Sequence, residues 1–188
     1  MEQESRDRLI DRATELFSER GFHLIGVDEV IGASDELRFA MHRHFPRKED
    51  LVHAVLEKRC DYILGGIGQR QKEIPDPVGK IKGVFDWHGE WFRAPGFAGC
   101  LLERALSEFG AEAKDISDVA IRFKDTLKKQ MVDILRTLLP HTHAVRLAVV
   151  YAMLLHGAST AAHAHGDPEV ARRAWQSAKV LLDEARCG

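Results

Sequence analysis

Apolar side chains recur every three or four residues along almost the whole sequence, and this spacing constrains the fold more than any other feature. In the segment 115–139 the residues that share this spacing are Phe123, Leu127, Met131, Ile134 and Leu138. Few segments alternate apolar and polar residues as a half-buried strand does, and no rhythm of alternating strands and helices appears. The sequence therefore predicts an all-α fold.

Glycine, proline and capping residues divide this pattern into nine expected helices. Gly21 is placed as the C-terminal cap of the first helix, Pro46 stops the third, and Asp76 followed by Pro77 begins the fifth. The apolar spacing of the fourth segment weakens at three glycines, the first of which is Gly65. We expect helices over about residues 4–20, 27–33, 37–45, 48–64, 77–93, 98–109, 115–139, 142–163 and from 168 onward.

The composition is that of a folded cytoplasmic protein. The chain has 188 residues, of which 45% are hydrophobic and 30% charged. We expect no secretory signal and no segment apolar enough to span a bilayer, so membrane association is not predicted. The three cysteines, Cys60, Cys100 and Cys187, are widely spaced and odd in number. Reduced thiols are expected rather than a disulfide framework, and no metal or other cofactor is predicted.

Charge is distributed unevenly along the chain. Residues 1–50 carry 8 Lys and Arg against 12 Asp and Glu, a net charge of −4, whereas the rest of the chain has a net charge of +2. A segment that binds nucleic acid normally carries positive charge. The N-terminal segment therefore starts at an electrostatic disadvantage for binding DNA.

Three runs of residues near the N-terminus resemble the signature of the TetR family of regulators. Ala13 to Phe22 is similar to its first helix, Val27 to Val30 to the start of its second, and His44 to Leu51 to the exit from its recognition helix into helix four. The resemblance extends over roughly 8–57. A second run, from Trp91 to Cys100, is similar to a pattern common in one group of TetR-like C-terminal domains.

This resemblance implies a helix-turn-helix head, residues 1–47, joined by a long fourth helix to a ligand-binding and dimerisation domain, residues 48–188. It also implies a homodimer in which each head lays its third helix in a major groove of operator DNA. Lys48 is expected to meet a phosphate at the start of helix four. The residues expected either to face DNA or to brace the recognition helix are Leu37, Arg38, Ala40, His42 and His44.

The middle of the motif departs from the family pattern. Asp35 and Glu36 stand where members typically have the turn glycine and an apolar residue, and Ala40 and His42 replace a hydroxyl and a phenol. A carboxylate of Glu36 in the core would be costly, so it must reach solvent or re-set the turn. On this interpretation Asp35→Gly together with Glu36→Val raises stability and DNA affinity. Altered or lost operator binding stays open.

The C-terminal domain is expected to hold a small hydrophobic effector in a cavity bounded by helices four to eight. Aromatic and histidine side chains are the candidates for its wall, although each of them also fits plain core. Cys100 follows a Pro-Gly turn near a helix start, where a thiol is either reactive or buried and inert. The candidate ligand-binding residues are Tyr62, Phe85, His88, Trp91, Cys100, Phe123, Tyr151 and His156.

The last two helices are rich in apolar and small residues. They form either a four-helix interface across a two-fold axis or part of the monomer's own core. The leading hypothesis is a ligand-responsive transcriptional repressor. The alternative keeps the fold but is a dimeric small-molecule-binding or interaction protein with impaired or altered DNA binding. An enzyme is not predicted, because no nucleophile–base spacing, phosphate loop or convincing metal set appears.

Overall fold

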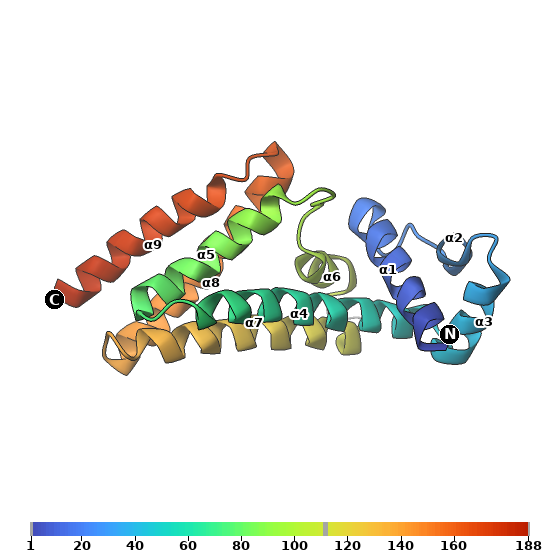
Figure 1. The fold of residues 1–188 in the computed structure, drawn as a ribbon, viewed down its shortest axis with the longest axis horizontal. Helices are drawn as coiled ribbons and strands as arrows, with labels where there is room; N and C mark the ends of the chain where they lie inside the picture. Colours follow the sequence, from blue (N-terminus) through green and yellow to red (C-terminus); the bar gives the residue numbers. More distant parts are fainter. Residues whose placement is uncertain (1, 111–112, 188) are drawn as a thin grey trace. The chain divides into compact units, whose positions relative to one another are not determined.

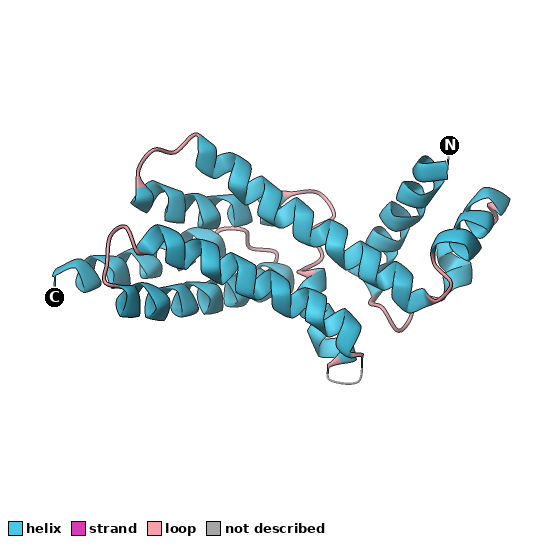
Figure 2. Cartoon of the chain, turned by 90° about the horizontal axis from the view of Figure 1, so that it is seen from below, coloured by secondary structure: helices cyan, strands magenta, loops and turns pink. Residues whose placement is uncertain are grey.

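The computed structural model describes residues 2–110 and 113–187, and within them it contains nine α-helices and no strand (Figures 1 and 2). The expected all-α fold is confirmed. The helices are α1 (Glu2–Arg20), α2 (Val27–Ile31), α3 (Asp35–His44), α4 (Lys48–Lys72), α5 (Pro77–Arg93), α6 (Leu101–Phe109), α7 (Lys114–Leu135), α8 (His141–His165) and α9 (Val170–Cys187).

The chain divides into two compact units. The first contains the described residues up to Asp61 and those from Cys100 to Ile121, and the second contains Tyr62–Gly99 and the described residues from Arg122 onward. Helices α4 and α7 contribute residues to both units. The expected head, residues 1–47, lies in the first unit, and its boundary at 47 stays a prediction.

The core of the first unit forms around the apolar face of α1. Leu9, Ala13 and Phe17 are fully buried on this face, and α1 packs mainly against α3. Phe22, just beyond the end of α1, places its ring 5.1 Å from the ring of Phe17. The predicted amphipathic first helix is therefore a core helix of this unit.

Helix α6 binds the C-terminal end of α1. The Arg104 guanidinium donates hydrogen bonds of 3.0 Å to the carbonyl oxygens of Phe17 and Ser18. A carboxylate oxygen of Glu108 accepts from the backbone N–H groups of Phe22, at 2.8 Å, and His23, at 3.1 Å. Because the last carbonyls of a helix have no partner within it, these contacts satisfy groups that would otherwise need water. They tie α6 firmly to α1 and the loop after it.

The second unit is built from helices packed through aromatic side chains. The Phe85 ring on α5 lies 5.8 Å from the ring of Tyr151 on α8 and 5.6 Å from that of Trp175 on α9. The Tyr151 hydroxyl donates a 2.8 Å hydrogen bond to the carbonyl of Ala178. This bond satisfies a hydroxyl that is completely buried, so α8 and α9 are joined by polar as well as apolar contacts.

Helix α4 continues through its three glycines to Lys72, so the expected end near Gly65 is wrong. A Cβ atom added at Gly66 would lie 2.2 Å from the indole nitrogen of Trp87. The glycine therefore permits a close approach of Trp87 and does not end the helix. The neighbouring Ile63 and Ile67 are fully buried, and their packing holds the helix together across the glycines.

Helix α8 differs from the expectation that no segment is apolar enough to span a bilayer. By length and composition alone it is one such helix within the described residues. About a third of its most apolar window, 33%, is buried within the chain. One such helix is weak evidence for a membrane span, because core helices of soluble proteins pass the same test.

Candidate functional site

The turn between α2 and α3 depends on Gly32. This glycine lies three residues before position 35, where the family pattern has its turn glycine. Gly32 has a φ of 61°, whereas no non-glycine residue among those described has a positive φ. Ser34 then caps α3, its side chain accepting a 3.2 Å hydrogen bond from the N–H of Leu37. Asp35 is the first residue of α3, so the interpretation that it occupies the glycine position of the turn was wrong.

Glu36 is exposed and bonded to α1. Its carboxylate accepts a 2.6 Å hydrogen bond from the Ser5 hydroxyl and forms a 3.1 Å ion pair with Arg8. The Ser5 hydroxyl, followed by the charge of Arg8, holds the pKa of Glu36 below its usual value. Both solutions offered by the sequence are realised, because the side chain reaches solvent and the turn is re-set.

The predicted recognition residues on α3 fall into two groups. Leu37 and Ala40 are each only 4% exposed and brace the helix against the core. Arg38 and His42 are exposed, and His44 is half-buried with its ring 6.3 Å from that of Phe45. Whether Arg38, His42 or His44 contacts DNA stays a prediction.

Phe39 belongs to the exposed side of α3 and was missed from the sequence. Its side chain is 68% exposed. The signal that identifies it is its spacing, since it lies between the buried positions 37 and 40 and one turn before the exposed Arg43.

The start of α4 carries an internal ion pair beside Lys48. The Asp50 carboxylate accepts from the Arg47 guanidinium at 2.7 and 3.3 Å and from the Arg47 backbone N–H at 3.0 Å. These hydrogen bonds raise the pKa of Arg47 and lower that of Asp50. Because Arg47 is engaged in this capping arrangement, Lys48 remains the expected phosphate contact.

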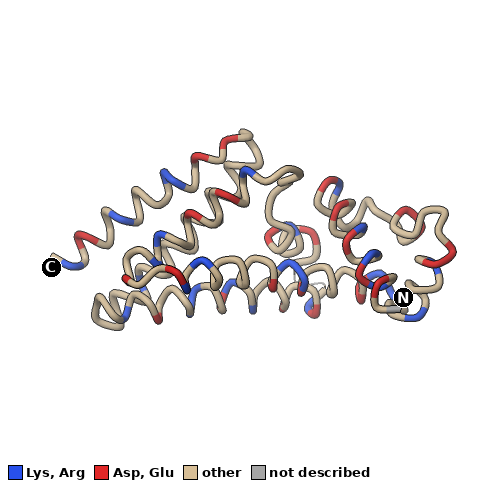
Figure 3. Tube along the Cα trace, viewed as in Figure 1, with Lys and Arg blue, Asp and Glu red and all other residues tan. Residues whose placement is uncertain are grey.

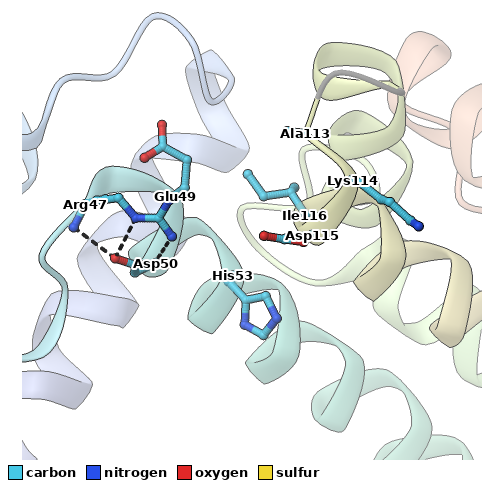
Figure 4. A pocket seen from close by; sticks show the side chains of 8 residues that line it. All are labelled: Arg47, Glu49, Asp50, His53, Ala113, Lys114, Asp115 and Ile116. Carbon is cyan, nitrogen blue, oxygen red and sulfur yellow. Dashed lines mark hydrogen bonds and ion pairs between the residues drawn. The ribbon is translucent and has the colours of Figure 1, made fainter.

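A pocket of about 690 Å³ opens beside this pair (Figure 4). Its wall is polar and carries charges of both signs, and Figure 4 shows the Arg47 and Asp50 side chains turned toward each other. The carboxylates beside the cations make it an unsuitable site for the hydrophobic effector that the sequence predicts. The lining residues are Arg47, Glu49, Asp50, His53, Ala113, Lys114, Asp115 and Ile116.

Acidic residues of the first unit are compensated by pairing. Basic and acidic residues both occur along α1 and α3 (Figure 3). Arg20 pairs with Glu29 at 2.6 Å, and Lys58 of α4 pairs with Asp11 of α1 at the same distance. The net charge of −4 over residues 1–50 therefore overstates the negative field, since part of it is neutralised locally and by a residue beyond position 50.

The predicted ligand-binding residues lie in the second unit, except Cys100, which lies in the first. Phe85, His88, Trp91, Phe123 and Tyr151 are buried, whereas His156 is half-buried. Tyr62 is 52% exposed, and its ring lies 5.6 Å from that of Trp87. The structure brings Phe85 against Tyr151, and His88 against Trp91 at 6.0 Å. Their roles in ligand binding stay predictions.

Two histidines of this set are neutral at pH 7. Burial lowers the pKa of His88 to about 4, and burial with the nearby charge of Lys124 lowers the pKa of His156 to about 4. The Nδ1 atom of His88 is 2.8 Å from the carbonyl oxygen of Val84, which can only accept, so Nδ1 carries the proton. Both side chains therefore behave as uncharged, weakly polar parts of an apolar region.

Cys100 does not have the character of a reactive thiol. It occupies the N-cap position of α6, where the helix dipole would favour a thiolate. The residue as a whole is half-buried, but desolvation of its thiol raises the pKa to about 11, with a further rise from Glu103. Because a thiol with this pKa stays protonated at neutral pH, the inert interpretation is favoured.

Comparison with known proteins finds a family match within the first unit. Residues 9–55 match the family described as bacterial regulatory proteins, tetR family. Among curated proteins, the transcriptional activator FasR of Mycolicibacterium smegmatis is 32% identical over 83 residues, which are 44% of this chain and 38% of FasR. The repressor KstR2 of the same organism is 29% identical over 80 residues, 43% of this chain and 39% of KstR2. The chain thus matches about two fifths of the length of these relatives.

Solved structures extend the likeness to the whole fold. SCO4454, a TetR-family transcriptional regulator from Streptomyces coelicolor, matches with a TM-score of 0.90 at 24% identity, over 98% of this chain and 97% of that one. A TetR transcriptional regulator from Chloroflexus aurantiacus matches with a TM-score of 0.86 at 18% identity, over 97% and 96%. Residues 9–55 thus match the tetR family model, and the described helices follow the fold of solved TetR-family regulators.

Proposed function

We propose that this chain is a DNA-binding transcriptional repressor of the cytoplasm. It acts as a homodimer, and a small hydrophobic effector in the second unit controls its affinity for operator DNA. The observation that carries the proposal is the helix-turn-helix itself, in which Gly32 and Ser34 form the turn and α3 exposes one side. An α-helix fits the major groove of B-form DNA. The named relatives are an activator and a repressor, not enzymes.

The proposed dimer interface is the exposed apolar stripe of α8 and α9. Val145, Val149 and Met153 follow one another at four-residue intervals on α8 and are 37%, 42% and 59% exposed. Val180 on α9 is 56% exposed. A stripe of this length buries its apolar surface when α8 and α9 pair with the same helices of a second copy. Two heads related by a two-fold axis then read a palindromic site.

The proposed effector region is the aromatic layer that contains Phe85, His88, Trp91 and Tyr151. These side chains are buried, and His88 is uncharged at pH 7. An apolar wall with few polar groups suits a hydrophobic ligand. The remaining candidates, Tyr62, Phe123 and His156, extend the same proposal to α4, α7 and α8.

Selection of fragments from the source genome by the purified full-length protein tests the DNA-binding function. Binding of the selected duplex is then measured by fluorescence anisotropy between 50 and 200 mM salt. We expect sequence-selective binding whose logarithm falls linearly with the logarithm of salt concentration, with a slope of about −0.9 for each phosphate contact. Failure to select any sequence at any salt concentration would support the alternative, a dimeric ligand-binding or interaction protein.

A further inference from the structure

We propose that Phe39 is a specificity-determining residue that contacts the C5-methyl group of a thymine in the major groove. This inference rests on the proposed DNA-binding function and adds to it one residue and the base feature that it recognises. The proposal stands on the exposure of Phe39, its position on α3 and the chemistry of the neighbouring side chains.

Phe39 is not required by the core of the first unit. Leu37, Ala40 and Met41 supply the buried side of α3, with exposed fractions of 4%, 4% and 3%. Phe39 is 68% exposed on the opposite side. A single exposed apolar side chain is ordinary on a protein surface, so exposure alone identifies no function. The position of Phe39 supplies the second observation.

That position is near the middle of the exposed side of the second helix of the helix-turn-helix. With about 3.6 residues in each turn, Asp35 lies one turn before Phe39 and Arg43 one turn after it. Arg38 and His42 flank it on the other side of the same exposed surface. When α3 enters a major groove, the residues at the middle of this surface meet base edges and the flanking cations meet phosphates.

Beside Phe39, a groove of about 540 Å³ runs between α3 and the start of α1, and its exposed lining is predominantly apolar. Ala40, Arg43 and His44 contribute to its wall together with Phe39. The concavity leaves room for the edge of a base pair next to the phenyl ring. The phenyl ring and the other apolar atoms of this wall give no hydrogen bonds to a base, so Phe39 itself discriminates by apolar contact.

The thymine methyl group is the apolar feature of base edges in the major groove, where the other bases present hydrogen-bond donors and acceptors. Asp35 adds to this selectivity, because its carboxylate repels the two acceptor atoms of guanine more than the single acceptor atom that thymine presents there. A phenyl ring beside a carboxylate thus fits a thymine better than a guanine. The geometry therefore favours thymine at the base pair that Phe39 meets.

The test begins with a duplex selected from a randomised library by the wild-type protein. Each thymine of one half-site is replaced in turn by deoxyuridine, which removes only the methyl group. At one position we expect the affinity of the wild type to fall about fourfold, as the loss of one buried methyl predicts, and about fifteenfold when both half-sites are changed. Phe39→Ala should bind the original duplex more weakly and lose its sensitivity to that replacement.

Two further variants serve as controls. Leu24→Ala removes an apolar side chain that is 72% exposed but lies before α2, so it should leave both affinity and methyl sensitivity unchanged. Phe39→Leu keeps an apolar side chain and should retain part of the sensitivity. Circular dichroism and thermal unfolding verify that each variant folds like the wild type.

The outcomes separate this inference from the function on which it rests. If the wild type selects a site but Phe39→Ala responds to deoxyuridine as the wild type does, the thymine contact is overturned and the DNA-binding function stands. A selected half-site without thymine has the same consequence. If the wild type selects no sequence, the proposed function and this inference both fail.

Discussion

The sequence predicts that a glutamate at position 36 is unfavourable for the turn, whereas the contacts of Glu36 in the structure stabilise the first unit. Because its carboxylate binds Ser5 and Arg8, we expect Glu36→Val to lower the melting temperature at pH 7. The pKa of Glu36 is lowered by folding, so its contribution is present above about pH 4.5 and is lost as the pH falls. Thermal unfolding of the variant and the wild type at pH 7 and pH 3 measures this difference, which should shrink at pH 3.

Glu36→Gln is the matched control, because it keeps an acceptor for Ser5 and removes only the charge. We expect it to lose less stability than Glu36→Val. An increase in melting temperature for Glu36→Val would restore the opposite interpretation, in which the acid is a defect of the turn.

His88 makes the stability of the protein depend on pH in the mildly acid range. Its pKa is 6.5 as an unperturbed side chain and about 4 when folded, so between these values the unfolded state binds a proton that the folded state does not. Stability therefore falls as the pH is lowered from 6.5 to 4, by roughly 3 kcal/mol if His88 alone is counted. Chemical denaturation across this range should show a flatter dependence for His88→Phe than for the wild type.

His156 has a similarly lowered pKa and adds to the same dependence, so the slope for His88→Phe should be reduced and not abolished. The exposed His165 provides a control, since His165→Asn removes a titratable group without opening the core. An unchanged slope in His88→Phe would show that this imidazole does not control the acid sensitivity.

At the level of helices and turns, glycines with different surroundings predict opposite effects of alanine. Gly32 has a φ of 61° and a ψ of −141°, and an added Cβ would lie 2.7 Å from an Arg12 guanidinium nitrogen. We expect Gly32→Ala to lower the free energy of unfolding by at least about 1 kcal/mol. Gly65 lies inside α4 with nothing within 4 Å of an added Cβ, so Gly65→Ala should raise it by about 0.5–1 kcal/mol.

Urea denaturation of the two variants and the wild type measures both changes under identical conditions. If Gly32→Ala were as stable as the wild type, the turn would have to tolerate a side chain there. In that case the turn would not be organised around this glycine.

The number and approximate extent of the helices are predictable from the sequence, because apolar spacing averages over many residues. The effect of a single glycine on a helix cannot be predicted in this way, since it depends on residues distant in the sequence. Helix α4 continues past Gly66, against which Trp87 packs closely. The turn is formed by Gly32, while the family pattern points to position 35, because Ser34 caps α3 earlier than the pattern places it.

The candidate site is predictable to the level of the helix but not of the side chain. The sequence directs attention to α3, where Leu37 and Ala40 take the bracing role that it allowed, while the exposed Phe39 was overlooked. Helix α3 starts two residues earlier than expected. Which of its side chains are buried is then determined by its packing against α1. The family pattern assigns roles to these positions from their places in the motif. It does not show which of the side chains are buried in this chain.

At the scale of the whole molecule, α8 is apolar enough to span a bilayer by length and composition, and its exposed apolar side chains need an explanation. A bilayer-spanning helix is apolar on all sides, whereas α8 buries Leu147, Tyr151 and Leu155 within the second unit and exposes a separate stripe. An exposed apolar stripe beside a buried apolar face is what a helix with two packing partners presents. The proposed dimer of this chain would account for the exposed apolar residues of α8.

Introducing a charge into that stripe tests the dimer directly. Met153 is 59% exposed and lies one turn from Val149, so Met153→Glu would bury an unpaired carboxylate in the proposed interface. We expect the dimer dissociation constant to rise by more than about tenfold, as measured by analytical ultracentrifugation, with the helical content unchanged. Ile121→Glu, at a residue that is 47% exposed on α7, should leave the dimer intact. Because a palindromic site needs both heads, Met153→Glu should also weaken binding to the selected duplex, and a variant that stays fully dimeric would exclude this stripe as the interface.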